Sequence, residues 1–443
     1  MGVRAPCGSE PSAIRLCTPV STGGMSPALS RFDALLKSAL LLATLGILAV
    51  HCHITTNPYL AYALLGSFVI HYRSSAGRPA CLSAALILGL AYAMIYVALG
   101  ASLRSVNSLG FLGVGSVAVL GVMSFWPEYK QRAETLRVWW LTLLFPAFLI
   151  CSAIVLTLTR YAHPRVLDLY LYTLDGRLGF QPSFTVGRLL WQNTILREIA
   201  YYAYEALPLG MAFAFSLEWE AKIRSAASIV ISFLFAAIGG YLIYNLFPAV
   251  GPIHVFGNAF PFSPPAVTAR PSAIVNTGDP RNCMPSVHFT MALLIFWYSR
   301  QWTRWGRIFA CGLLLLTIVA TLGFGEHYLI DLVVAVPFAL LAKTLATRAV
   351  RPAYVRMLCY ATAGFLVSAW IFYLRCFFSF AMIPAAVSWA LLVITVIPPM
   401  MLERELHQAA TAALDGCEQA GDLEPLTGIE PVTSSLPRTR STN

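Results

Sequence analysis

Charged side chains are scarce in this chain of 443 residues, because Asp, Glu, Lys and Arg together make up only 11% of it. A soluble protein carries about 25% of these residues. The hydrophobic fraction is 58% and the mean hydropathy is +0.69. So large a deficit of charge, spread over many long apolar runs, excludes an ordinary soluble domain. It predicts an all-α, polytopic integral membrane protein.

Closely spaced cysteine pairs are also lacking. None of the 10 cysteines belongs to a C-x-x-C motif, and most lie inside apolar runs. A zinc site or a disulfide framework is therefore not expected. The net charge of +10 does not indicate nucleic-acid binding either, because the basic residues fall in short gaps between apolar runs. That distribution is typical of membrane topology.

Runs of about 20 apolar residues predict about twelve transmembrane helices. Lys and Arg are concentrated in alternate gaps between these runs, which places those gaps and both termini in the cytoplasm. The expected helices are 35–53, 58–70, 80–100, 109–126, 138–158, 198–216, 226–247, 285–299, 306–324, 328–346, 357–375 and 380–401.

Polar ends flank these runs. Residues 1–33 are expected to be a disordered cytoplasmic N-terminus, and 34–137 the N-terminal transmembrane helices. A six-helix catalytic core is expected over 138–350, followed by C-terminal transmembrane helices over 351–402. A disordered cytoplasmic tail is expected over 403–443.

Two longer segments lie on the side opposite the basic gaps. Residues 164–190 mix Leu and Tyr with Asp and Arg, which predicts an amphipathic helix in the interface and then a turn from Gly179 to Pro182. Residues 248–284 contain many prolines, so neither a helix nor a central strand is expected there. An ordered loop of this length is usually functional.

The stretch CMPSVHF, residues 283–289, carries a histidine where an apolar helix begins. Pro285 suits the first helical turn, and the free amides at a helix N-terminus form a ready anion site. His288 lies in the same turn. Free amides beside a titratable imidazole predict a phosphate site.

The stretch GEHYLID carries a second histidine, followed four residues later by an acid. His327 and Asp331 are expected to share one helix face, with the carboxylate accepting a ring N–H of the histidine. The other ring nitrogen is then free to act as a nucleophile. The expected topology brings His327 and His288 to the same, non-cytoplasmic membrane face.

PSVH followed by HYLID resembles the second and third motifs of the type 2 phosphatidic acid phosphatase superfamily, P-S-G-H and H-x-x-x-D. Val287, in place of the glycine, makes the chain most similar to the branch that contains fungal inositol phosphorylceramide synthase and its bacterial relatives. The resemblance covers about 225–350 well and 164–252 more loosely.

The resemblance implies a mechanism for these residues. His327 would attack a phosphoryl group and form a phosphohistidine, and Asp331 would orient His327. His288 would protonate the leaving oxygen and then activate the acceptor. Ser286 and its amide would bind a phosphate oxygen. No metal or other cofactor would be needed.

Two cations of the superfamily's pattern are missing. Ser263 stands where the first motif has its lysine, and Thr321 stands where the third motif has its arginine. This departure argues against phosphatases of soluble substrates. Arg281 and Arg270 are the replacements expected to bind phosphate as planar forks.

Other polar residues have open interpretations. Glu205 either binds an acceptor or bonds to a neighbouring tyrosine. Asp175 and Arg177 are expected to form an ion pair at the surface rather than a lid. His254 in the proline-rich loop is a weaker candidate for the site.

We therefore expect an integral membrane phosphotransferase that acts on lipid phosphoesters through a phosphohistidine. Its expected partners are the bilayer, a lipid phosphoester and a lipid or water acceptor, and not a nucleic acid. Hydrolysis of a lipid phosphate, such as phosphatidic acid or a polyprenyl or sphingoid phosphate, is the alternative. A membrane transporter is the alternative of another class, although paired repeats and broken midplane helices are not seen.

Overall fold

The chain is described by a computed structural model at residues 58–74, 79–98, 110–125, 132–220, 225–267, 271–276, 278–347, 353–377 and 384–419, and before them only at isolated positions between 35 and 46. The described part is almost entirely helical, which confirms the predicted all-α class. Its long helices are α2 (Pro58–Arg73), α3 (Pro79–Ala98), α4 (Gly110–Phe125), α5 (Arg132–Ala162), α9 (Leu207–Glu220), α10 (Ser225–Leu246), α12 (Val287–Tyr298), α13 (Arg304–Gly323), α14 (Leu329–Ala346), α15 (Ala353–Phe372) and α16 (Ala385–Gln419). The shorter elements are β1 (Arg165–Val166), α6 (Asp168–Gly176), α7 (Pro182–Gln192), α8 (Thr194–Glu205), α11 (Pro252–Phe256), η2 (Gly257–Ala259), β2 (Ile274–Val275), η3 (Ser299–Gln301) and η4 (Tyr373–Phe377).

Six helices of the described part are long and apolar enough to cross a membrane, which supports the predicted integral membrane localisation. They are α5, α10, α13, α14, α15 and α16. The predicted count of about twelve is not confirmed. Helices do occupy further expected positions, but α2 and α4 have 16 residues each and α12 has 12, short of the roughly 20 a full span needs. The expected run 35–53 lies almost wholly outside the described residues.

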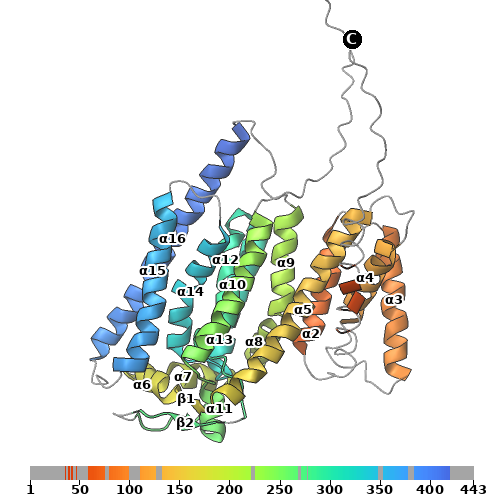
Figure 1. Cartoon of the computed structure of the whole chain (residues 1–443). Coiled ribbons are helices and arrows are strands. Elements are labelled where there is room, and N and C mark those ends of the chain that lie inside the picture. Colours follow the sequence, from red (N-terminus) through yellow and green to blue (C-terminus); the bar gives the residue numbers. More distant parts are fainter. Residues whose placement is uncertain are drawn as a thin grey trace, which may run out of the picture.

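The long helices form one bundle (Figure 1). Helices α2 to α5 lie on one side of it, α15 and α16 lie on the other, and α9, α10 and α12 to α14 stand between them. The first group joins the middle through α2, which packs against α4, α5 and α9. Helices α2 and α4 approach closely at Gly113, where an added Cβ would lie 1.8 Å from the carbonyl oxygen of Leu64. Small residues of this kind allow close packing of membrane helices.

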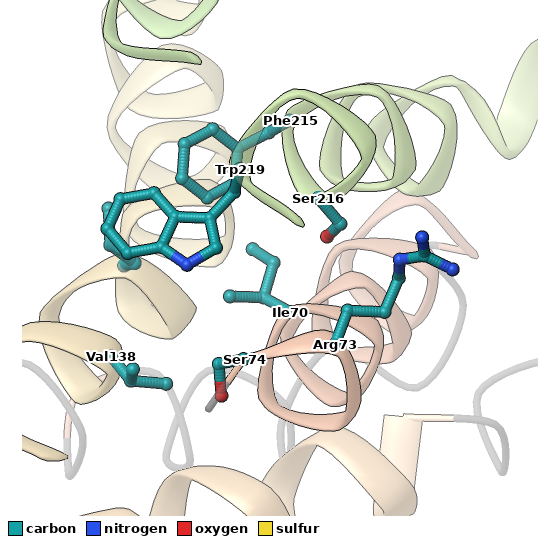
Figure 2. A pocket seen from close by; sticks show the side chains of 8 residues that line it. Ile70, Arg73, Ser74, Val138, Phe215, Ser216 and Trp219 are labelled. Atoms are coloured by element: carbon teal, nitrogen blue, oxygen red, sulfur yellow. The ribbon is translucent and has the colours of Figure 1, made fainter. Parts of the chain in front are cut away.

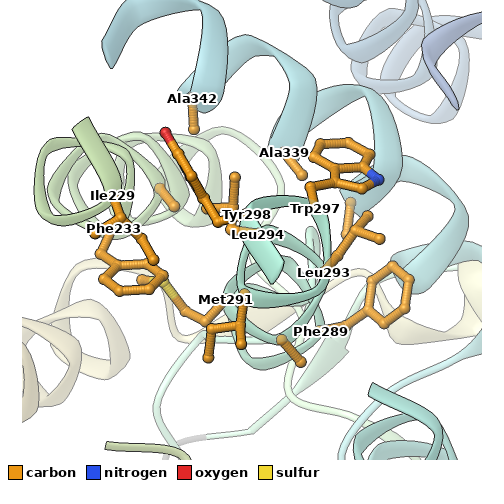
Figure 3. Packing of buried hydrophobic residues seen from close by; sticks show 14 of the residues in the cluster. Ile229, Phe233, Phe289, Met291, Leu293, Leu294, Trp297, Tyr298, Ala339 and Ala342 are labelled. Carbon is orange, nitrogen blue, oxygen red and sulfur yellow. The ribbon is translucent and has the colours of Figure 1, made fainter. Parts of the chain in front are cut away.

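Helix α14 is the centre of the bundle. It packs against α10, α12, α15 and α16, and 83% of its residues are buried. Figure 3 shows the adjoining core, in which Met291, Leu294 and Trp297 of α12 meet Phe233 of α10 and Ala339 of α14. Because α12 and α14 are buried by other helices, their N-terminal ends are held by packing as well as by hydrogen bonds.

The predicted helix 198–216 is interrupted. Helix α8 ends at Glu205, α9 begins at Leu207, and Pro208 lies at the break. Proline has no amide hydrogen and its ring clashes with the carbonyl four residues earlier, so a single straight helix is disfavoured here. The break turns α8 toward the short elements of the fold.

The short elements α6, α7, β1, β2 and α11 gather at one end of the bundle (Figure 1). The predicted turn between Gly179 and Pro182 is confirmed, because Gly179 has φ +94° and α7 begins at Pro182. The expectation of no helix in 248–284 is wrong for two short pieces, α11 and η2, whereas β2 is one strand of a two-stranded sheet and not a central strand. Pro252 occupies the first turn of α11, where proline is tolerated.

The opposite end of the bundle contains a buried ion cluster. Glu403 of α16 is fully buried and lies 2.5 Å from Lys343 Nζ and 2.5 Å from an Nη of Arg300. Since a buried charge without a partner is costly, these contacts tie α16 to α14 and to η3. Helix α16 continues to Gln419, so the tail expected to be disordered from 403 is helical as far as that residue.

Candidate active site

His327 lies in the short loop between α13 and α14. Its backbone amide donates to the Thr321 carbonyl at 3.1 Å, and its carbonyl accepts from the Ser183 hydroxyl at 2.8 Å. The ring Nδ1 lies 2.8 Å from the carbonyl oxygen of Cys283. A carbonyl only accepts, so Nδ1 must carry the proton and Nε2 has the free lone pair. The side chain is thus held in the tautomer that a nucleophile needs.

Asp331 lies on the same side of this ring but is not its closest partner. Its Oδ2 accepts from the Tyr328 amide at 2.7 Å and from the Cys283 thiol at 2.8 Å, and it is 3.6 Å from His327 Nδ1. The expected direct hydrogen bond from His327 to Asp331 is therefore replaced by one to the Cys283 carbonyl. The expected shared helix face is also wrong, because α14 begins at Leu329 and His327 precedes it.

His288 is in the first turn of α12, as expected. Its ring stacks on the Tyr204 ring with centroids 4.4 Å apart, and its Nδ1 is 3.4 Å from the Tyr204 hydroxyl. The ring centroid of Tyr59 of α2 lies 5.8 Å from that of His288. His288 interacts electrostatically with His327 and with Glu326. The fold therefore brings both predicted histidines into one site.

Ser286 is fully buried and caps α12. Its hydroxyl accepts from the Phe289 amide at 3.3 Å, and its own amide donates to the Asp331 carbonyl at 3.3 Å. Pro285 consequently lies before the cap and not in the first helical turn. The role of Ser286 as a phosphate ligand stays a prediction. Its hydroxyl can donate to a phosphate oxygen while it accepts from the Phe289 amide, whereas its own amide would first have to leave the Asp331 carbonyl.

Arg281 is fully buried and its guanidinium already has acceptors for all of its N–H groups. Nε and one Nη donate to the His163 carbonyl at 2.8 and 2.6 Å. The remaining N–H groups face the side-chain and backbone oxygens of Asn276 and the carbonyl of Asp279. Arg281 therefore stabilises the loop before PSVH through these hydrogen bonds. Its binding of phosphate stays a prediction. Arg270 lies outside the described residues.

Two aspartates of α6 bind backbone amides of the site loops. Asp168 accepts from the Val250 and Gly251 amides, the latter at 2.8 Å. Asp175 accepts from the Leu329 amide at 2.8 Å and from the Ile330 amide at 3.2 Å. The expected surface ion pair of Asp175 is therefore wrong: its carboxylate is buried at the N-terminus of α14.

The spacing of these two aspartates was a usable signal, because residues seven apart share a helix face. Burial raises the pKa of Asp168 to about 7 and that of Asp175 to about 8, although the amide bonds act in the opposite direction. Both carboxylates bind backbone amides of the site loops. They fix the chain on either side of the two histidines.

Glu326 is a site residue that the sequence did not single out. Its Oε2 lies 3.6 Å from His254 Nε2, and His254 Nδ1 lies 3.1 Å from Asp279. Burial raises the pKa of Glu326, but the contact with His254 and the charges of His254, His327 and His288 lower it below its usual range. His254, a weak candidate in the sequence, thus lies beside the site.

Cys283, His327 and Asp331 offer side-chain atoms within 4.8 Å of one another, a spacing that a metal ion can use. Hydrogen bonding explains their closeness, because the thiol donates to Asp331. Burial raises the pKa of the Cys283 thiol well above its ordinary value, whereas a metal binds the thiolate. Hydrogen bonding alone therefore accounts for this spacing, and a metal ion would have to displace the thiol proton.

A small cavity lies between α2, α5 and α9 (Figure 2), lined by Arg73, Val138, Phe215 and Trp219 among others. It is remote from His327. The end of α5 near the site is Thr159, whose hydroxyl accepts from the Arg281 amide, and Val138 is about 30 Å away along the helix. The cavity does not belong to the candidate active site.

Residues 169–345 match the model of the PAP2 superfamily. This segment contains both histidines, Asp331, Ser286 and Asp175 of α6, and it begins one residue after Asp168. The match supports the superfamily that PSVH and HYLID indicate, and it does not single out a branch. No curated protein and no solved structure matches the chain.

Proposed function

We propose, on the premise that residues 169–345 are a PAP2 superfamily segment, that this membrane protein transfers the phosphoryl head group of a lipid through a phosphohistidine on His327. The observation that carries the proposal is the environment of His327. Its Nδ1 faces the Cys283 carbonyl at 2.8 Å, which leaves Nε2 as the nucleophile, and His288 is in the same site.

The first step breaks the bond between phosphorus and the diacylglycerol oxygen of the donor. Nε2 of His327 forms the new bond to phosphorus, and the ring becomes cationic. Asp331, 3.6 Å from Nδ1, stabilises that charge. Burial and the nearby His327 lower the pKa of His288 to about 4, so this ring takes up its proton when the anionic donor is bound. It then gives that proton to the departing oxygen, so that diacylglycerol leaves as a neutral alcohol.

The second step returns both histidines to their starting states. An acceptor hydroxyl gives its proton to neutral His288 and attacks phosphorus, and the bond between phosphorus and Nε2 breaks. Tyr204, stacked on His288, holds that ring in place for both steps. A ceramide-like or diacylglycerol-like hydroxyl gives transfer, and water gives hydrolysis.

Transfer of a phosphoryl-polyol group is the favoured reaction, as in inositol phosphorylceramide synthase. Thr321 and Ser263 replace two cations of the phosphatase pattern, and Arg281 is occupied by carbonyl oxygens. A site with fewer free cations suits a phosphodiester better than a phosphomonoester, which carries more charge.

Hydrolysis of a lipid phosphate is the second candidate. The observation that favours it is the exposure of Glu326, whose side chain is 28% accessible beside the almost fully buried His327. Solvent therefore reaches the rim of the site, and water can serve as the acceptor.

The test is a head-group transfer assay in proteoliposomes. Phosphatidylinositol labelled in its head group is supplied with ceramide, with diacylglycerol or without an acceptor lipid. The proposal expects label in a new lipid when the acceptor is ceramide, or a diacylglycerol whose acyl chains differ from those of the donor, with little water-soluble inositol phosphate. Release of soluble product at the same rate under all three conditions supports hydrolysis and contradicts transfer.

A further inference from the structure

Glu326 places a carboxylate one residue before the proposed nucleophile. Its amide donates to the Thr321 carbonyl at 3.1 Å, and its carbonyl faces the Cys283 thiol at 3.5 Å. The backbone of Glu326 is thus fixed from both sides. An acidic side chain at this position repels a phosphate group. Its presence beside a phosphate-transfer centre therefore indicates a separate function.

His254 favours the charged form of this carboxylate, and Asp279 favours the charged form of His254. The His254 ring lies between Glu326 and Asp279, at 3.6 and 3.1 Å. Burial alone would lower the pKa of His254, but Glu326 and Asp279 outweigh it and raise the pKa above its ordinary value. When His254 is protonated it stabilises the charged form of Glu326, which also interacts electrostatically with His327 and His288.

Glu205 supplies a second carboxylate to the same space. It ends α8 next to Tyr204, its exposure is 9%, and it interacts electrostatically with Glu326 and with Tyr59. Its Oε2 is buried and has no hydrogen-bond partner among the described residues. A buried carboxylate oxygen without a donor is costly, so a donor supplied by a ligand fits this position.

The chemistry of two carboxylates limits the ligand. Burial and the charge of Glu326 raise the pKa of Glu205 to about 7, so Glu205 is partly protonated near neutral pH and Glu326 carries the charge. An ionised carboxylate accepts hydrogen bonds and donates none, so it binds hydroxyl groups. It also repels a phosphomonoester, which carries about two negative charges near neutral pH, more strongly than a phosphodiester, which carries about one.

From this arrangement we infer that Glu326, with Glu205, is a specificity-determining residue that accepts hydrogen bonds from a hydroxyl-bearing head group and selects such phosphodiester donors over phosphomonoesters. The inference rests on the proposed function and adds a donor-selecting role for two residues outside the two motifs. His254 acts through Glu326 as a positioning residue.

The test compares three donors that separate charge from hydroxyl recognition. Phosphatidylinositol is a diester with hydroxyls, phosphatidylmethanol is a diester without them, and phosphatidic acid is a monoester. Loss of a hydrogen bond to a charged group predicts that Glu326→Gln lowers kcat/KM for phosphatidylinositol by about 10- to 100-fold. Phosphatidylmethanol turnover reports any change that is common to all donors. Relative to it, the same variant should raise kcat/KM for phosphatidic acid several-fold.

Phosphatidylmethanol turnover also reports whether the variant is folded. The matched control is Glu198→Gln, the same chemical change on α8 at a side chain that is 51% exposed, and it should leave all three donors unaffected. Glu205→Gln should repeat the pattern of Glu326→Gln. Equal losses for all three donors would mean a structural role and would overturn the inference.

Different results would contradict the proposed function and the role of Glu326. If the wild-type protein turns over none of the donors, or is not labelled at His327, the phosphotransfer mechanism itself is wrong. If the wild-type protein is labelled at His327 and Glu326→Gln leaves the donor preference unchanged, only the role of Glu326 is wrong. A wild-type preference for phosphatidic acid over phosphatidylinositol also contradicts that role.

Discussion

The ring of His327 donates its Nδ1 proton to the backbone carbonyl of Cys283, with 2.8 Å between the two heavy atoms. Asp331 stands 3.6 Å from the same nitrogen. Two tasks that the sequence assigned to one residue are thus divided. The carbonyl fixes the tautomer and the carboxylate stabilises the charge that the ring acquires.

Asp331→Asn should lower kcat without abolishing it. An opposite charge within about 4–6 Å favours the charged form of a group by about 1–3 pKa units, so loss of this carboxylate predicts a decrease of about 10- to 1,000-fold. Steady-state head-group transfer, with KM nearly unchanged, is the measurement. The control is Cys283→Ala, which keeps the carbonyl and should cost less than about tenfold. Equal losses in both variants would contradict the division of tasks.

His288→Gln should affect donors according to their leaving groups. Loss of a general acid costs about 10²- to 10⁴-fold when the leaving group is an alkoxide. A p-nitrophenyl ester of phosphoinositol departs without protonation, so its release of p-nitrophenol in the first turnover should be nearly normal. A burst assay at 405 nm, about the absorbance maximum of p-nitrophenolate, measures it. Equal losses for the lipid donor and the activated donor would remove His288 from the role of acid.

Asp175→Ala should destabilise the site loops. The carboxylate accepts from two amides at the N-terminus of α14, and loss of a buried acceptor costs about 1–3 kcal/mol. The thermal unfolding midpoint in detergent should fall, whereas Glu198→Ala at an exposed position should leave it in place. An unchanged midpoint for Asp175→Ala would show that the amides find other acceptors at no cost.

The contact of His254 with Glu326 should depend on pH. The pKa of His254 is raised, so its contribution to stability is present below its ordinary pKa of about 6.5 and is lost as pH rises through the folded value. The pKa of Glu326 is lowered, so its contribution is lost only in acid. His254→Gln should therefore lower the unfolding midpoint more at about pH 6 than at about pH 9. A pH-independent difference would contradict this contact.

The sequence predicted those features that depend on local pattern. Apolar runs indicated the helices, and PSVH with HYLID indicated the two histidines that the fold brings together. The interruption at Pro208 was also present in the sequence, because proline disfavours a continuous helix. A continuous helix was nevertheless predicted over 198–216, because apolar residues continue on both sides of Pro208.

Long-range partners were beyond the reach of the sequence. The acceptors of Arg281 are carbonyls of His163 and of the loop at Asn276, and a backbone carbonyl has no signature in the sequence. Asp175 binds amides more than 150 positions away in the chain. Glu326 was overlooked because an acid beside a nucleophile opposes the expected chemistry of an anion site.

The phosphohistidine at His327 is the central claim, and trapping it is the most direct test. Purified protein is mixed with phosphatidylinositol labelled with ³²P, quenched in base and digested, and the labelled peptide is identified by mass spectrometry. The account predicts an acid-labile, base-stable label on His327 that is absent from His327→Ala and is removed when an acceptor lipid is added. Label on another residue, or full turnover by His327→Ala, would contradict it.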